Sequence, residues 1–318
     1  MKQIDRRTVL QSGAAVLGSG LVMTTSAQHA VGQYFGQSYI EENVAPENMN
    51  DVLRWADQAL LAVRDQGLTP PEASRVLGIG FMAGFAAMNG IRNRYSDSLG
   101  FGRGPENADA LAAYHVAIET TLSGAMGRSF RGMRGRMLAR IPDGEAKSMG
   151  MRWGKHVGQK IQARRARDGA EPTKSPYYRG PMQKRNHVLA WEPTLPVYRS
   201  GVGPRIDPFI RPLLPSWGLV EPLGVRDIKR FRAERFPDPR SQLFWDDVKL
   251  VHKLGGTNSP ERSRDESHIA FFWEDGPRGA TPGGHFIIIG AQLLQNHVDQ
   301  YGMARALALM GMASCDAG

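Results

Sequence analysis

Histidine and cysteine are the residues in this 318-residue chain most suited to metal or nucleophilic chemistry, and they are few and scattered. His252 and His268 are sixteen residues apart and His285 and His297 twelve apart. Neither pair has the spacing of three or four that brings two ligands onto one helical face. Cys315 alone makes neither an intramolecular disulfide nor a multi-thiolate site. We therefore expect no divalent-metal site.

Neighbouring carboxylates are the next candidates for chemistry. Asp246-Asp247 and Asp265-Glu266 are each adjacent in the chain, and adjacent residues of a helix point about 100° apart. They therefore predict a solvated face and a helix start rather than the facing acids of a glycosidase. The glycine-rich stretch 100–104 lacks a Walker lysine and is expected to be a turn, and no Gly-x-Ser-x-Gly elbow occurs.

Positive charge is the strongest compositional bias. The formal net charge is +9 and the pI is near 9.8, which favours anionic partners without separating small phosphate-like molecules from an anionic membrane surface. The basic residues include a glycine-punctuated connection and a later group: Arg128, Arg131, Arg134, Arg136, Arg140, Arg164, Arg165 and Arg167. Because no stacking aromatic residues are interleaved, we expect no nucleic acid partner.

Helical periodicity predicts the elements of the first half. The expected helices span 50–64, closed by Gly67, then 69–92, 107–126 and 143–167. The second should open with a capping box, Thr69 to Glu72, and should pack closely against a neighbour at Gly80 and Gly84. His115 falls on the apolar face of the third and is expected to be a hydrogen-bonded core residue.

The second half changes in kind. Residues 169–239 hold 12 of the chain's 20 prolines and show no sustained period, so they predict an extended arm. Helical patterns return at 241–254, at 263–273 after a second capping box, at 285–296 after a loop over 276–284, and from 299 onward. The predicted fold is all-α, a helical bundle with the long Pro-rich arm packed across it.

The first residues have the layout of a signal peptide. Arg6-Arg7 precede a mildly apolar, Gly/Ala-rich stretch over 12–23, and small residues continue to Ala27. This is similar to a twin-arginine export signal cleaved after Ala27, and it predicts an exported protein, periplasmic or extracellular. The apolar run 76–91 is shorter than the roughly 20 residues of a membrane span, so we expect a buried helix and no stable span.

Several stretches in order resemble vanadium-dependent haloperoxidases of the type 2 phosphatidic acid phosphatase superfamily. They cover nearly all of the chain after the signal: Ala73-Ser74-Arg75-Val76-Leu77 through Met88-Asn89-Gly90-Ile91; Trp191-Glu192-Pro193-Thr194; Pro212-Leu213-Leu214-Pro215-Ser216-Trp217-Gly218; Val248-Lys249; Leu254-Gly255; Ile269-Ala270-Phe271-Phe272-Trp273-Glu274-Asp275-Gly276; and Thr281-Pro282-Gly283-Gly284-His285-Phe286. The resemblance implies helical bundles and a bound vanadate, or phosphate in the phosphatases.

The resemblance also implies a set of catalytic motifs that this sequence lacks. Family members hold the oxyanion with a lysine and arginine on one motif, a Ser-Gly-His motif, and an arginine six residues ahead of a histidine; none can be placed here. Residues 313–318 resemble the helix that leads into the first motif, so we expect the chain to end just short of it. Pro282-Gly283-Gly284-His285 differs from Pro-Ser-Gly-His at Gly283, and without its context we interpret it as a chance likeness.

Asp275 is the one residue that the resemblance places near the oxyanion pocket. The acid at this position in family members pairs with an arginine of the pocket. Without the missing motifs that partner is absent, and an ordinary acid at a loop or helix end explains the residue equally well.

The sequence therefore predicts a signal over 1–27 and a haloperoxidase-like part over 28–318. That part comprises helices over 48–168, the arm over 169–239 and helices over 240–318. The lineage is that of a vanadium-dependent haloperoxidase, which oxidises halide with peroxide, or a related phosphatase; the intact member would take a small anionic ligand. The chain alone would lack vanadate ligands and be inactive.

Two alternatives stay open: a self-sufficient enzyme with a site around Asp275 and His285, and a non-catalytic exported protein that binds anionic partners. Oligomeric state is not predicted.

Overall fold

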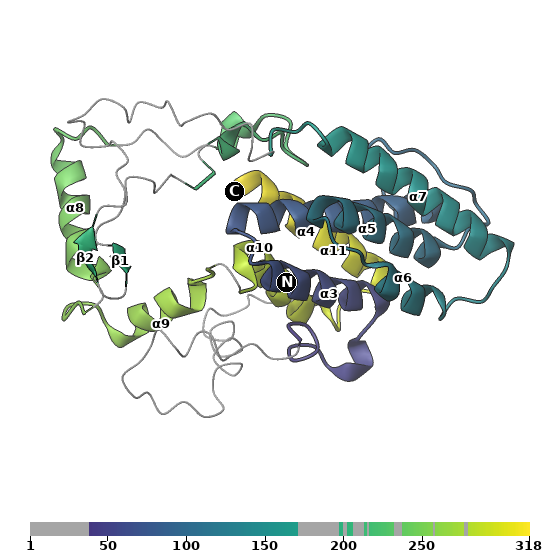
Figure 1. The fold of residues 1–318 in the computed structure, drawn as a ribbon, viewed down its shortest axis with the longest axis horizontal. Helices are drawn as coiled ribbons and strands as arrows, with labels where there is room; N and C mark the ends of the chain where they lie inside the picture. Colours follow the sequence, from purple (N-terminus) through teal and green to yellow (C-terminus); the bar gives the residue numbers. More distant parts are fainter. Residues whose placement is uncertain are drawn as a thin grey trace. The chain divides into compact units, whose positions relative to one another are not determined.

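Helices dominate the structure, a computed structural model that describes residues 38–170, 197–199, 202–205, 213–214, 216–231, 237–256, 258–276 and 279–318 (Figure 1). The elements in order are η1 Pro46–Asn48, α3 Asp51–Gln66, α4 Pro70–Arg92, α5 Ala110–Met126, α6 Arg131–Leu138, α7 Glu145–Arg165, β1 Val197–Arg199, β2 Val202–Arg205, η4 Trp217–Leu219, η5 Ile228–Phe231, α8 Gln242–Gly255, α9 Arg264–Trp273, α10 Thr281–Leu294 and α11 Gln300–Ala317. The strands form one antiparallel pair. The all-α prediction is confirmed.

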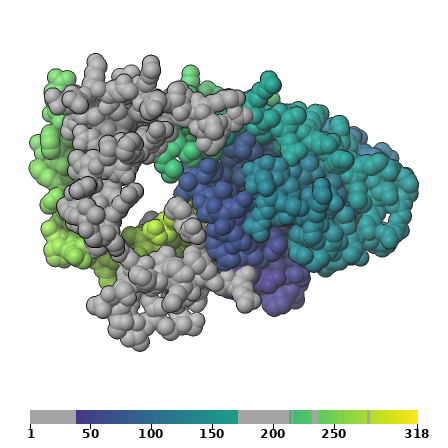
Figure 2. Space-filling view, in the orientation of Figure 1, coloured from purple at the N-terminus to yellow at the C-terminus, as the bar shows by residue number. Residues whose placement is uncertain are grey.

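The chain divides into two units. The first comprises the residues up to Arg164 together with Leu223–Arg226 and Asp265–Gly318, and it contains helices α3 to α6, most of α7 and of α9, α10 and α11. The second comprises Arg165–Pro222 and Asp227–Arg264, with the strand pair, η4, η5 and α8. Figure 2 shows the purple-to-teal residues of the first unit as closely packed side chains.

The first helices begin and end where local chemistry requires. Asn50 caps α3 by accepting hydrogen bonds from the amides of Val52 and Leu53, and Gly67 ends it with a left-handed backbone at φ 61°. The Thr69–Glu72 capping box starts α4 as predicted. These groups satisfy backbone donors that a helix end otherwise leaves without partners.

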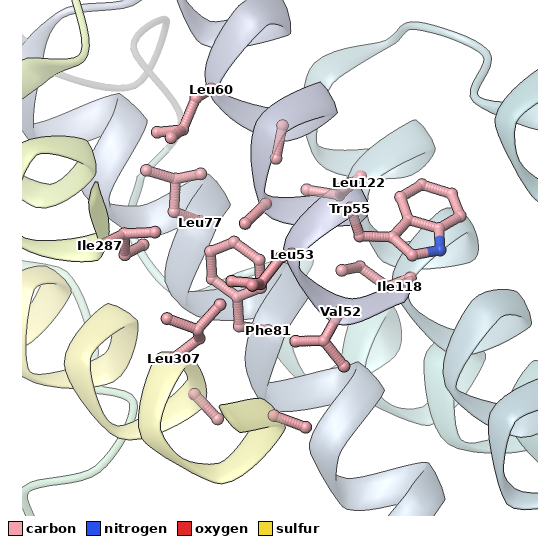
Figure 3. Packing of buried hydrophobic residues seen from close by; sticks show 14 of the residues in the cluster. Val52, Leu53, Trp55, Leu60, Leu77, Phe81, Ile118, Leu122, Ile287 and Leu307 are labelled. Atoms are coloured by element: carbon pink, nitrogen blue, oxygen red, sulfur yellow. The ribbon is translucent and has the colours of Figure 1, made fainter. Parts of the chain in front are cut away.

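Helix α4 lies in the middle of the core. It packs against α5, where a Cβ on Gly80 would come within 2.7 Å of Leu122 and one on Gly84 within 2.5 Å of the Tyr114 ring. Both close approaches were predicted, and both require glycine. Around α4, side chains from α3, α5, α10 and α11 gather into the same apolar core, as the labelled Phe81, Leu77 and their neighbours show (Figure 3).

Helix α11 covers another face of α4. A Cβ on Gly78 would lie 2.8 Å from the backbone oxygen of Gly311, so the two backbones are nearly in contact. Near the end of α11, the Asp316 carboxylate accepts hydrogen bonds from the amides of Leu223, Gly224 and Val225 at 2.5, 2.8 and 2.9 Å. This short part of the predicted Pro-rich arm is thereby attached to the bundle; most of the arm lies outside the described residues.

Two local predictions were wrong. The connection over 128–140 contains helix α6, because Met133, Met137 and Leu138 are buried and outweigh the poor helix propensity of its glycines. Helix α10 starts at Thr281 rather than 285, and its first turn includes Gly283 and Gly284. The helix predicted over 241–254 is confirmed as α8, and of its apolar residues Phe244 alone is buried.

A polar network crosses the core beside α3, and it contains His115. The Trp55 indole Nε1 donates a hydrogen bond to His115 Nδ1 at 3.0 Å, which confirms His115 as a hydrogen-bonded core residue. His115 Nε2 lies 3.3 Å from Asp51, whose other oxygen is 2.8 Å from Arg140 Nη1. Burial pushes the pKa of Asp51 upward, but His115, Arg140 and Arg54 outweigh it, so that the pKa lies below its ordinary value.

The predicted export signal, with Arg6, Arg7 and Ala27, lies outside the described residues, as does the Trp191-Glu192-Pro193-Thr194 stretch. Both stay predictions. Among the described helices, none combines the length and apolar character that crossing a membrane requires.

Gly154→Ala should destabilise the fold by about 1–3 kcal/mol, because the new methyl would lie 2.2 Å from the backbone oxygen of Ala113 on α5. Urea unfolding measures the loss. The matched control is Gly135→Ala in α6, where a Cβ meets nothing within 4 Å and the better helix propensity of alanine should leave stability unchanged or higher. Equal stabilities of the two variants would contradict this account of the helix packing.

Asp51→Asn should cost about 1–3 kcal/mol at neutral pH, because the buried His115 and the half-exposed Arg140 lose a charged acceptor. Since the pKa of Asp51 is lowered on folding from 3.8, the stabilisation is present above that value and is lost as the pH falls through the folded-state pKa. Unfolding measured across acidic pH should show the difference from the unaltered protein shrinking. The exposed control Asp247→Asn should change little, and a loss that did not depend on pH would contradict the assignment.

Candidate functional site

Asp275 and His285 form a close pair in the first unit. The Asp275 carboxylate Oδ2 lies 2.9 Å from His285 Nδ1, and the two residues are ten apart in the chain. Asp275 follows the end of α9, and His285 stands one turn into α10. The early start of α10 therefore directs His285 back toward the acid.

Aromatic rings surround the imidazole. The ring centroid of Phe272 lies 4.7 Å from that of His285, and the Trp273 centroid lies 5.2 Å away. The side chains of His285 and Asp275 are only 15% and 13% exposed. The pair is thus partly shielded from water, which strengthens the interaction between its two members.

The geometry defines what the imidazole can do. When the ring is neutral, a carboxylate at Nδ1 favours the tautomer with its proton on that nitrogen, which leaves the Nε2 lone pair free. Nε2 makes no hydrogen bond to a described residue, and the side chain as a whole is 15% exposed. A group of this kind can accept a proton or bind a single electrophilic centre.

Comparison with solved structures identifies the fold. The chain matches the crystal structure of "the first bacterial vanadium dependant iodoperoxidase" with a TM-score of 0.63 and 18% sequence identity, over 84% of this chain and 66% of that one. This chain has a haloperoxidase-like fold. At this identity the likeness shows the fold alone, and the chain spans just under two thirds of the iodoperoxidase. No family model matches the sequence, and no curated protein matches it.

The residues at the pair do not fit a vanadate ion. A multiply charged oxyanion needs several converging cationic donors. Here the imidazole faces a carboxylate and aromatic rings, and no lysine or arginine forms an ion pair with Asp275 among the described residues. Among all the residues that the structure describes, no group of three or more His, Cys, Asp or Glu side chains is placed to hold a metal ion.

From the sequence, Asp275 and His285 were placed together only in one alternative, the self-sufficient enzyme. His285 was interpreted as part of a chance motif, whereas the haloperoxidase-like fold brings it to the acid. An Asp-Gly pair at a helix end followed by a histidine just inside the next helix was the available signal. Sequence spacing alone did not show that the intervening loop folds back. Whether Asp275 lies near an oxyanion pocket stays a prediction.

Replacing Asp275 with alanine should change the tautomer of His285, because the carboxylate is what holds the proton on Nδ1. Under alkaline conditions, nitrogen NMR of the imidazole should show Nδ1 protonated in the unaltered protein and Nε2 protonated in the variant. The exposed His297 serves as an internal control that should not change. If His285 has the same tautomer in both proteins, Asp275 does not control the position of the imidazole proton.

Proposed function

We propose that this chain is the helical scaffold of a vanadium-haloperoxidase-like protein, and that its own residues do not complete the oxyanion site. The observation that carries the proposal is the haloperoxidase-like fold, combined with a sequence that contains none of the family's oxyanion-binding motifs. A fold does not by itself confer a reaction, so the chemistry must be judged from the residues present.

The comparison supports a scaffold that needs further residues. The iodoperoxidase extends beyond the part that this chain matches, since only 66% of it is covered. A site for vanadate requires a set of cations and an imidazole, whereas the described pair offers one imidazole whose neighbour is an anion. Activity would require cationic donors other than the described residues around the pair.

Asp275 has a specific place in this proposal. The resemblance puts an acid at this position beside an arginine of the oxyanion pocket. In the chain alone, His285 takes that place at 2.9 Å, so the carboxylate is not left without a counterpart in a partly shielded site. In a completed site, an incoming arginine would compete with His285 for the same carboxylate.

Halide oxidation tests the proposal directly. The purified chain is mixed with vanadate, peroxide and iodide, and iodide oxidation is compared with the same mixture without protein. Because no described lysine or arginine forms an ion pair at the Asp275–His285 pair to stabilise a bound oxyanion, we expect no rate above the free-vanadate background. Hydrolysis of a chromogenic phosphate ester, which tests the phosphatase lineage, should likewise stay at background.

The opposite result would identify a self-sufficient enzyme. If either rate exceeds the background and His285→Ala abolishes it, the proposal is wrong and the Asp275–His285 pair is an active site. His297→Ala is the matched control, because His297 is exposed and is not part of the pair. Activity that survived both substitutions would also overturn the proposal, and would place the site elsewhere.

A further inference from the structure

The first turn of α10, residues 281–285, starts at a residue that is both strained and unsatisfied. Thr281 has a positive φ of 63°, a backbone conformation that glycine adopts easily and a β-branched residue rarely does. Asn93 and Leu214 are the other non-glycine residues with a positive φ among those described, and neither is β-branched. The Thr281 side chain is fully buried, and its hydroxyl has no hydrogen-bond partner among the described residues. Both features oppose the formation of this turn.

The turn also lacks the local groups that begin other helices. Asn50, Asp109 and Asp299 cap α3, α5 and α11 by accepting hydrogen bonds from backbone amides. At α10 the N-cap position is Ala280, which offers no such acceptor, and no acid stands in the first turn. Two residues of the turn are glycines, which are poor helix formers. Local sequence therefore does not explain why α10 begins before residue 285.

Packing provides one part of the explanation. A Cβ on Gly283 would lie 2.7 Å from Ser74 Oγ, and one on Gly284 would lie 2.6 Å from Leu60 Cδ2. The two glycines therefore let the turn lie directly against α4 and α3. Just after the turn, Ile287 is fully buried in the main core, so the rest of α10 is held by apolar burial.

The hydrogen bond between Asp275 and His285 provides the other part. It joins the segment just after α9 to the last residue of the turn, at 2.9 Å. The Trp273 ring also contacts this region, with its centroid 5.2 Å from that of His285 and 5.7 Å from that of Phe286. Of these contacts, the hydrogen bond is the one that involves a carboxylate, and its partly shielded setting strengthens it.

We propose that the Asp275–His285 hydrogen bond is a latch that keeps the first turn of α10 closed. When a cation takes over the Asp275 carboxylate, the bond is broken, and the strain and the buried hydroxyl of Thr281 then favour unwinding of residues 281–285. Unwinding moves His285 away from the acid, and the buried Ile287 marks where it stops. The latch is a property of this chain alone, whereas its role in regulating access to the oxyanion site rests on the proposed function.

Amide hydrogen exchange tests the latch residue by residue. In an α-helix each amide bonds to the carbonyl four residues earlier, so the His285 and Phe286 amides report on residues 281 and 282. We expect Asp275→Ala to speed the exchange of these two amides about tenfold or more, because a hydrogen bond to a charged group is lost. The amides of Gly290 and Ala291, later in the same helix, should exchange as in the unaltered protein.

Glu274→Ala is the matched control. It removes an exposed acid next to Asp275 that makes no hydrogen bond or ion pair with a described residue. Thermal unfolding verifies that both variants are folded. If Glu274→Ala speeds exchange of the His285 and Phe286 amides as much as Asp275→Ala does, the effect is one of general charge and the latch is wrong.

Thr281→Val tests the strained start of the turn. Valine keeps the β-branched shape and replaces the unpartnered hydroxyl with a methyl group, so the closed turn no longer buries an unsatisfied polar group. We expect exchange of the His285 and Phe286 amides to slow by about threefold. Unchanged or faster exchange would show that the hydroxyl does not oppose the closed turn, which contradicts the proposal.

These measurements involve neither vanadate nor oxidation, so the latch and the proposed function can fail separately. Unchanged exchange in Asp275→Ala would rule out the latch and leave the scaffold proposal in place. Iodide oxidation above background would overturn the scaffold proposal, while faster exchange in Asp275→Ala would still support the latch.

Discussion

The close contact of helix α4 with its neighbours is the constraint on which the first unit depends. Gly78 meets the backbone of Gly311 on α11, while Gly80 and Gly84 admit side chains of α5. A larger residue at any of these positions would push two helices apart and open the core between them. The positions of α5 and α11, and of the groups attached to them, follow from these glycines.

The Asp275–His285 pair shows why a haloperoxidase-like fold and haloperoxidase chemistry must be kept apart. The fold supplies a partly shielded imidazole whose tautomer a carboxylate controls. Oxyanion chemistry requires in addition a concentration of positive charge at one point, and the pair holds an acid there instead. Oxyanion chemistry at this pair would therefore need cationic residues beyond the described ones that surround it.

Positive charge is plentiful elsewhere, with a formal excess of nine over the chain. Much of it is neutralised locally, as where Arg134 pairs with Glu119 and Arg140 with Asp51. On α3, Asp65 lies 3.3 Å from Arg64 and 3.5 Å from Arg128.

The sequence by itself determined the all-α class and the beginnings and ends of α3 and α4. An N-cap asparagine, a capping box and a left-handed glycine act on backbone groups only a few residues away, so their effect can be read locally. The apolar period likewise predicted which face of α5 is buried, including His115.

Only the tertiary structure decided that α6 forms, that Asp275 meets His285, and that Arg64 shares a cavity with Arg136. Helix α6 contains two glycines and is stabilised by the burial of its methionines, which no local pattern could show. The Asp275–His285 contact depends on how the loop between α9 and α10 folds back, and the cavity shared by Arg64 and Arg136 depends on how α3 and α6 pack. Contacts between residues far apart in the sequence are determined by the packing of the whole core rather than by spacing along the chain.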